Sequence, residues 1–173
     1  MEFNDVVELN KKVFELSFLN RYNSHPRIVN ENLTTHMYSV AFVSMLLYDY
    51  YKSTHNGLDL PKILKMALIH DVCELETSDV SHVAKSKYKE LKQVLDRIEE
   101  DFTKETFKDE QYVNLMKEFN VGESVEAQIV KMADAMSCVI YADNELKLGN
   151  QSMQRVSDQS KKRVEEMRKR LKK

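Results

Sequence analysis

The sequence has 173 residues and a formal net charge of -2, which predicts one domain without a global attraction to nucleic acid or anionic membranes. Three glycines and two prolines leave little turn material for a sheet protein, and helix-forming residues dominate the long segments. We therefore expect an all-α fold. No apolar run approaches the roughly twenty residues that span a bilayer, and Cys73 and Cys138 lack metal-type spacing. These features predict a reduced, cytoplasmic protein without a membrane partner.

The first predicted helix covers Asp5–Leu19, where apolar residues recur at helical spacing and Asn4 or Asp5 can cap the start. A polar segment with a proline, residues 20–32, interrupts this pattern and predicts a loop. The loop combines cations with rings, a set suited to an anion and a planar group: Arg21, Tyr22, His25 and Arg27. A solvated loop would have a similar composition, so both interpretations stay open.

The second and third predicted helices each carry histidine on an apolar surface. The second runs from Asn32 to about Ser53 and places His36 among core positions, where a histidine is more often a packing residue than a ligand. The third covers residues 60–77 and contains the adjacent pair His70 and Asp71. Burying an aspartate is costly unless something pairs with it, and a metal ion is one such partner.

The remainder of the chain also predicts helices, although Val80–Lys85 is ambiguous. The expected helices are Lys87–Phe107, Tyr112–Phe119, a strongly apolar one from Ser124 to Leu148, and Met153–Lys173. Asp134 lies deep within the apolar helix, where a ligand role explains a carboxylate economically. The basic end of the last helix retains an apolar stripe, which favours a packed or dimerising helix over a nucleic-acid contact.

Four residues on three predicted helices can therefore form one metal site: His36, His70, Asp71 and Asp134. Two imidazoles and two carboxylates suit a divalent ion such as Mn²⁺, Fe²⁺, Co²⁺, Ni²⁺ or Zn²⁺, with positions left for water and an oxygen-rich substrate. Glu74 follows His70 by four residues and can position a water or carry a proton. This pattern indicates an open, catalytic type of site.

The same residues resemble the HD-domain metal-dependent phosphohydrolases, whose pattern is an isolated histidine, a His-Asp pair and a distant aspartate. Three stretches are closer to the bacterial 5′-deoxynucleotidase branch: RYNSHPRIVNENLTTH, IHDVCELETSD and KMADAMSCVIYADNELKLGN. The resemblance runs from about Arg21 to Asn150. It implies a single HD domain over residues 1–173, with a core of about 21–150 and a bundle of about six to seven helices.

The resemblance also implies roles for individual residues. The four ligands would bind one divalent metal ion, and Glu74 would serve the attacking water. Arg21 would contact the phosphate, Tyr22 would pack beside the nucleotide, Asp79 would lie near sugar and phosphate, and Lys85 is a further phosphate-contact candidate. The implied reaction converts a deoxyribonucleoside 5′-monophosphate to nucleoside and phosphate, in a homodimer that binds no nucleic acid.

Three departures from the family pattern leave the substrate open. Thr35 replaces an acidic residue, Tyr22 replaces a tryptophan, and VSHVAK after Asp79 replaces a proline-containing loop that helps select sugar and base. One alternative is a small HD enzyme that hydrolyses deoxynucleoside triphosphates. Another, of a different class, is a non-catalytic helical interaction module.

Overall fold

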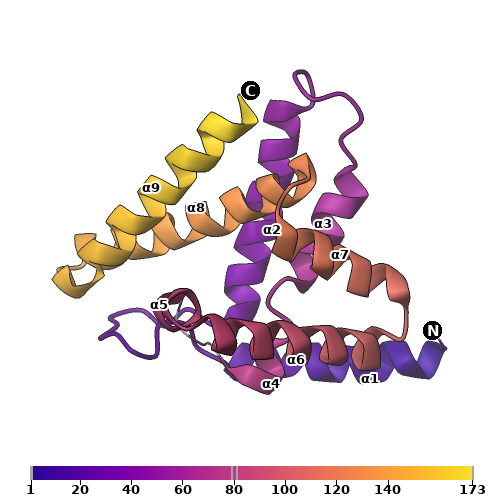
Figure 1. Ribbon diagram of the computed structural model, residues 1–173. Helices are drawn as coiled ribbons and strands as arrows, with labels where there is room; N and C mark the ends of the chain where they lie inside the picture. The colour runs from indigo at the N-terminus through magenta and orange to yellow at the C-terminus, as the bar shows by residue number, and fades with distance from the viewer. Residues whose placement is uncertain (1, 79, 81, 173) are drawn as a thin grey trace.

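The computed structural model describes residues 2–78, 80 and 82–172, which fold into packed helices (Figure 1). Their bounds are α1 Phe3–Glu15, α2 Leu33–Tyr51, α3 Leu60–Ile69, α4 Glu74–Thr77, α5 His82–Lys87, α6 Lys89–Phe107, α7 Glu110–Val121, α8 Val125–Lys147 and α9 Gln154–Leu171, with 3₁₀ turns at Leu16–Phe18 and Gln151–Met153. Extended pairing within these residues is limited to an isolated bridge between Asn20 and Asn32. The all-α prediction is therefore confirmed.

Helix starts follow the capping signals in the sequence, with one exception. At α2, α3 and α8 a cap side chain accepts a backbone N–H three residues on: Asn32 from Thr35 (2.9 Å), Asp59 from Lys62 (3.0 Å) and Ser124 from Ala127 (3.1 Å). The prediction that Asn4 or Asp5 caps the first helix is wrong, because α1 begins at Phe3. The Asp5 carboxylate instead accepts the N–H of Glu2 at 2.8 Å, inside the first turn.

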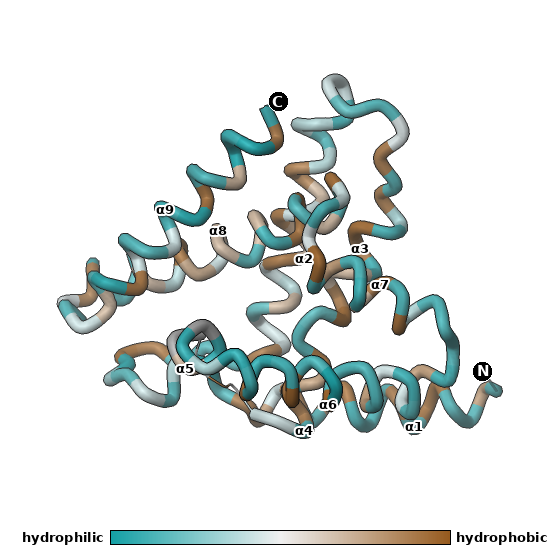
Figure 2. The backbone as a smooth tube through the Cα atoms, viewed as in Figure 1, coloured by the Kyte–Doolittle hydropathy of each residue, from teal (hydrophilic) through white to brown (hydrophobic). Residues whose placement is uncertain are grey.

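The core lies where α2, α3 and α8 meet, and Figure 2 shows hydrophobic segments gathered there. Side chains from all three helices are completely buried: Leu33, Val40, Ile63, Met66, Ile129 and Val130. Full burial of such a side chain stabilises the fold by about 1.5–3 kcal/mol before conformational entropy is subtracted. These contacts hold together the three helices that carry the predicted metal ligands.

The expected continuous helix over residues 60–77 is wrong, because α3 ends at Ile69 and α4 begins only at Glu74. Between them the amides of residues 72 and 74 bond to carbonyls three residues earlier, both at 3.0 Å, which is a tighter winding than an α-helix. Nδ1 of His70 donates a hydrogen bond to the Ala67 carbonyl at 2.8 Å. In a continuing α-helix that carbonyl would accept the N–H of Asp71 instead. The histidine thereby ends its own helix.

The last helix packs back along α8, and the two lie side by side in Figure 1. Asp143 of α8 accepts hydrogen bonds from Ser157 at 2.6 Å and Lys161 at 2.8 Å on α9. Apolar residues of α9, including Val164 and Met167, lie against the core. The prediction of a packed terminal helix is confirmed. Among the described residues, no helix combines the length and apolarity needed to cross a membrane.

Candidate metal centre

The four predicted ligands meet at one place in the fold. His36 comes from α2, His70 from the end of α3, Asp71 from the following turn and Asp134 from α8. One Asp71 oxygen lies 3.3 Å from Nε2 of His70 and 3.5 Å from Nε2 of His36, and an Asp134 oxygen lies 3.4 Å from Nε2 of His36. The candidate ligand atoms of the two histidines and Asp71 all lie within 4.8 Å of one another.

The two imidazoles supply the test of whether these residues fit a metal ion. Both rings are buried, and within the described part of the chain neither Nε2 atom has a hydrogen-bond partner. Each Nε2 lies 3.3–3.5 Å from a carboxylate oxygen, close enough for electrostatic attraction but without good hydrogen-bond geometry. Both Nε2 atoms face carboxylates whose side chains are about one-fifth exposed, Asp71 at 20% and Asp134 at 19%. A divalent cation placed among the four groups would satisfy both nitrogens and remain reachable from the carboxylate side.

The charges in the cluster also favour a cation. Burial alone would raise the pKa values of Asp71 and Asp134, but the neighbouring histidines outweigh it and hold both well below their usual range. Burial alone would lower the pKa of His70, yet the Asp71 carboxylate outweighs it and raises this pKa to about 9. The pKa of His36 is lowered by burial and by the charge of Arg21. The carboxylates therefore remain ionised, and a metal ion competes with a proton at His70.

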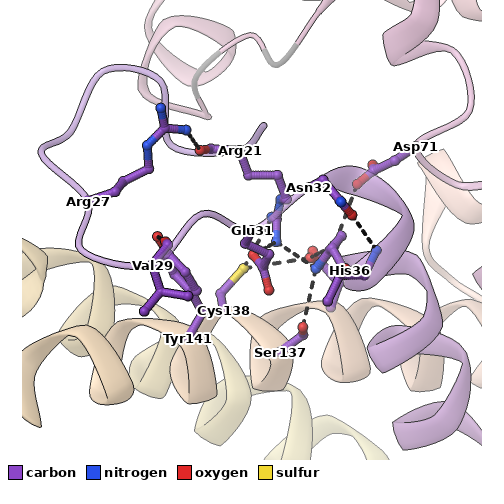
Figure 3. A network of polar contacts seen from close by, with 12 residues as sticks. Arg21, Arg27, Val29, Glu31, Asn32, His36, Asp71, Ser137, Cys138 and Tyr141 are labelled. Atoms are coloured by element: carbon purple, nitrogen blue, oxygen red, sulfur yellow. Dashed lines mark hydrogen bonds and ion pairs between the residues drawn. The ribbon is translucent and has the colours of Figure 1, made fainter. Parts of the chain in front are cut away.

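Arg21 lies behind His36, as Figure 3 shows. Nη1 of its guanidinium lies against Nδ1 of His36, and the guanidinium forms a 3.1 Å ion pair with Glu31 and reaches Sγ of Cys138 at 3.5 Å. The Ser137 hydroxyl is a second neighbour of the same Nδ1, at 3.2 Å. The Arg21 side chain is only 13% exposed and lies against His36, one of the predicted metal ligands. The phosphate contact implied by the resemblance stays a prediction.

The loop of residues 20–32 is tied to α8. Glu145, completely buried, accepts the backbone N–H groups of Ile28 at 2.9 Å and Val29 at 2.7 Å. The Tyr141 hydroxyl donates to the Val29 carbonyl at 2.7 Å, and its ring stacks on Tyr22 with centroids 4.7 Å apart. The backbone of this segment is thus fixed against α8, although several of its side chains are exposed. Tyr22 sits at the edge of the candidate site, and its contact with a nucleotide remains a prediction.

Glu74 and Lys85 line one cavity that begins immediately after the ligand turn. The cavity has a volume of about 140 Å³ and is lined by Cys73, Glu74, Thr77, Lys85, Lys92, Leu95, Asp96, Glu99 and Asn120. Glu74 is 7% exposed and is the first residue of α4. The structure thus brings these two predicted residues together at one cavity, although none of the four predicted ligands is among its lining residues. Asp79, the remaining predicted site residue, lies outside the described residues.

Several neighbours of the cluster were not predicted as functional. Ser137 and Cys138 lie one helical turn after Asp134, and this spacing is the signal that could have identified them. The Cys138 thiol, expected only to pack, lies 3.7 Å from an Asp134 oxygen. Arg163 of α9 reaches the other Asp134 oxygen at 3.6 Å. Nothing in the sequence pattern links Arg163 to the site, because this contact depends on how α9 packs.

Comparison with known proteins agrees with this geometry. Residues 14–173 match the HD domain family, whereas no curated protein matches the chain. A protein of Pyrococcus horikoshii is 26% identical and aligns over 94% of this chain and 88% of its own, with a TM-score of 0.78. An HD-domain phosphohydrolase of Listeria innocua is 20% identical, over 96% and 82% of the chains, with a TM-score of 0.81.

A third solved structure, the cyanophage S-2L HD phosphohydrolase DatZ, contains dA and one catalytic Zn²⁺. It is 17% identical over 94% of this chain and 93% of its own, with a TM-score of 0.65. At this identity the likeness shows a shared fold. Because the family match spans nearly all of the sequence, from residue 14 to residue 173, the chain belongs to the HD domain family.

Proposed function

We propose that this protein is a metal-dependent phosphohydrolase, a 5′-deoxynucleotidase that converts deoxyribonucleoside 5′-monophosphates to deoxynucleoside and phosphate. The observation that carries the proposal is the pair of buried Nε2 atoms, on His36 and His70, that face Asp71 and Asp134 without hydrogen-bond partners among the described residues. This donor set fits one divalent ion, Co²⁺, Mn²⁺, Fe²⁺, Ni²⁺ or Zn²⁺. Four protein ligands leave coordination positions for water and a phosphoryl oxygen.

Residues of the chain itself would transfer the proton, orient the metal ligands and supply positive charge. When bound, the metal supplies Lewis acidity toward a phosphoryl oxygen and lowers the pKa of water. Glu74 takes the proton of the attacking water at its carboxylate and returns it to the O5′ leaving oxygen as the P–O5′ bond breaks. The Ser137 hydroxyl accepts from Nδ1–H of His36 and holds the ring in the tautomer that leaves Nε2 for a metal, while Arg21 packs against the same ring and pairs with Glu31. Lys85 contributes positive charge to the cavity beside Glu74.

The charge of the cavity suits the neutral part of a nucleotide. Its lining contains two lysines, Lys85 and Lys92, and three carboxylates, Glu74, Asp96 and Glu99. Lys92 is already paired with Asp96 at 2.6 Å. Little unpaired positive charge is left there for a phosphate, whereas the neutral sugar and base of a nucleotide would not be repelled. The resemblance to the 5′-deoxynucleotidase branch is what favours a monophosphate over a triphosphate.

We also propose that the protein acts in the cytoplasm as a homodimer on small nucleotides, without nucleic-acid or membrane partners. Cys73 and Cys138 are both free thiols in the structure, which agrees with a reducing compartment. The small net negative charge agrees with a small-molecule substrate.

The proposed activity is tested by one screen of purified protein. Deoxynucleoside monophosphates, ribonucleoside monophosphates and deoxynucleoside triphosphates are each supplied with several divalent metals, and released phosphate and triphosphate are measured separately. We expect phosphate release from deoxynucleoside monophosphates. Triphosphate release from a deoxynucleoside triphosphate, with no phosphate from any monophosphate, would establish the triphosphohydrolase alternative instead.

Metal content is measured in parallel by elemental analysis of protein purified without chelator. We expect a bound divalent metal in the wild type and its loss in Asp71→Ala, because Asp71 faces both histidines. Asp49→Ala, which removes an exposed carboxylate of α2, is the matched control and should retain the metal. Equal, near-zero metal in all three proteins would leave the non-catalytic interaction module as the better description.

A further inference from the structure

Two cations outside the predicted set stand beside the outer face of the metal cluster. Nη2 of Arg163, on α9, lies 3.6 Å from Oδ2 of Asp134, while the other oxygen of that carboxylate faces His36. The Arg163 side chain is 36% exposed, compared with 13% for Arg21, which already contacts three side chains. Arg163 is therefore the arginine that a dissolved ligand can reach.

Lys131 approaches the same region from α8, one turn before Asp134. Its ammonium lies 4.9 Å from the centre of the Phe119 ring and 3.3 Å from the Asn120 carbonyl oxygen. The Phe119 ring in turn packs on His70, with centroids 5.5 Å apart. Within the described residues no carboxylate lies at ion-pair distance from Lys131. Partial burial and the nearby charge of Arg163 lower the pKa of Lys131, as expected for a cation in crowded positive surroundings.

When the cluster holds a metal ion, Arg163 and Lys131 lie in a region of excess positive charge, which a bound anion would neutralise. Asp134 would then share its charge with a dication, and less of that charge would remain to offset Arg163, which it contacts, and Lys131, which feels the charges of both. A phosphate group would relieve the repulsion because its oxygens carry negative charge and accept hydrogen bonds from such cations. The planar guanidinium of Arg163 can pair with two phosphate oxygens, whereas Lys131 provides a point charge.

We propose that Arg163 and Lys131 bind the phosphate group of the substrate, on the side of the metal centre that faces α9. This inference rests on the proposed phosphohydrolase function and assigns its phosphate contacts to residues that the sequence did not indicate. The cavity beside Glu74 is then left for the nucleoside part. Arg21 and Arg163 thus take different tasks, Arg21 behind His36 and Arg163 at the substrate.

The test measures binding of inorganic phosphate, independently of turnover. Mn²⁺-loaded wild type is compared with Arg163→Gln and Lys131→Gln by the paramagnetic relaxation that bound Mn²⁺ causes in the phosphorus NMR signal of phosphate. Arg168→Gln is the matched control, since Arg168 is a more exposed residue of α9 paired with Glu165 at 3.0 Å. We expect unchanged Mn²⁺ content throughout. Phosphate affinity should fall about tenfold or more in Arg163→Gln and less in Lys131→Gln, with no change in the control.

Each outcome separates this inference from the proposed function. Wild-type phosphate binding in Arg163→Gln, or no phosphate bound near Mn²⁺ in the wild type, would overturn the inference. Loss of Mn²⁺ in Arg163→Gln would show that Arg163 supports Asp134 instead, and would overturn it as well. Arg163-dependent phosphate binding by a protein that hydrolyses no nucleotide would sustain the inference and refute the proposed activity. If Arg163→Gln fails to fold, Arg163→Lys decides, with weakened phosphate binding expected because one ammonium replaces a two-point contact.

Discussion

At the residue scale, the geometry of the candidate metal centre depends on which ring nitrogen of each histidine already has a hydrogen-bond partner. Nδ1 of His70 donates to the Ala67 carbonyl, and Nδ1 of His36 can donate to the Ser137 hydroxyl. Both rings are therefore oriented with Nε2 toward the carboxylates. Such secondary contacts fix ring orientation in metal sites, and their loss typically costs about 10–100-fold in metal affinity.

Glu74→Gln tests the proton-transfer role. We expect the variant to keep its metal and to lose turnover by about 10²–10⁴-fold, because an amide cannot accept the proton of the attacking water. Steady-state kcat and elemental analysis measure the two effects. Glu76→Gln, an exposed change on the same short helix, should keep both properties. Wild-type turnover in Glu74→Gln would assign this carboxylate a structural role.

The pKa of His70 predicts how metal affinity depends on pH. Because this pKa is raised to about 9, the ring is protonated at neutral pH and must release its proton before Nε2 can bind a metal. Affinity should therefore rise as pH increases, by up to about tenfold per unit below pH 9, and level off above it. Calorimetry in buffers of different ionisation enthalpy should detect about one proton released per metal near neutrality. Metal binding without proton release would contradict the prediction.

At the scale of elements, two short connections place the site. The tight turn after α3 sets Asp71 beside His70, and the loop of residues 20–32 delivers Arg21 to His36 because Glu145 and Tyr141 of α8 hold its backbone. Neither connection has a regular apolar period. Their geometry comes from hydrogen bonds between side chains and the backbone. The same groups could form such bonds in other local structures, so the sequence alone does not specify this geometry.

Gly122, which ends α7, links helix termination to the proposed phosphate side. Its φ of +70° disfavours other residues, and an added Cβ would lie 2.8 Å from Cε of Lys131. Gly57, with φ of +83° and open space, is the matched control. We expect Gly57→Ala and Gly122→Ala each to lower the free energy of unfolding by about 1 kcal/mol, because positive φ strains alanine at both positions and the flexible end of Lys131 can move away from the added Cβ. Urea denaturation measures both, and a much larger loss in Gly122→Ala would show that Lys131 is held in place.

At the scale of the whole molecule, α2 presents an exposed apolar stripe opposite its ligand-bearing face. Its members recur every four residues, and their exposed fractions are 71% for Tyr38, 48% for Phe42, 50% for Leu46 and 69% for Tyr50. Large exposed apolar patches are uncommon on monomeric proteins. A second copy can cover such a stripe with the same stripe of its own, as two-fold symmetry requires.

We therefore expect the predicted homodimer to use this face. Phe42→Glu and Leu46→Glu should give monomers that still bind metal, because both side chains point away from His36 and the core. Leu148→Glu, which changes an equally exposed leucine beyond the end of α8, should leave the dimer intact. Sedimentation analysis decides between the states. A monomeric wild type, or dimers in both stripe variants, would contradict the prediction.

The helices and the metal ligands could be read from the sequence for physical reasons. Apolar spacing and capping residues act locally, so α2 and α8 begin where Asn32 and Ser124 indicate. Carboxylates inside apolar helices are costly unless paired, and that cost singled out Asp71 and Asp134, whereas His36 joined them through the four-residue combination and the resemblance to the HD pattern. The helix predicted over residues 60–77 was too long, because the spacing of apolar residues carries no information about a histidine side chain that bonds to the backbone of its own helix.

The sequence by itself determined the all-α class, the principal helices and the four residues of the candidate metal centre, because these follow from local propensity and from the cost of burying charge. Only the tertiary structure decided which nitrogens face the centre, that Arg21 lies behind His36, and that Arg163 stands beside Asp134. Those contacts join residues 15 and 29 positions apart along the chain. They depend on how a loop and a terminal helix pack against α8, and no local pattern encodes that packing.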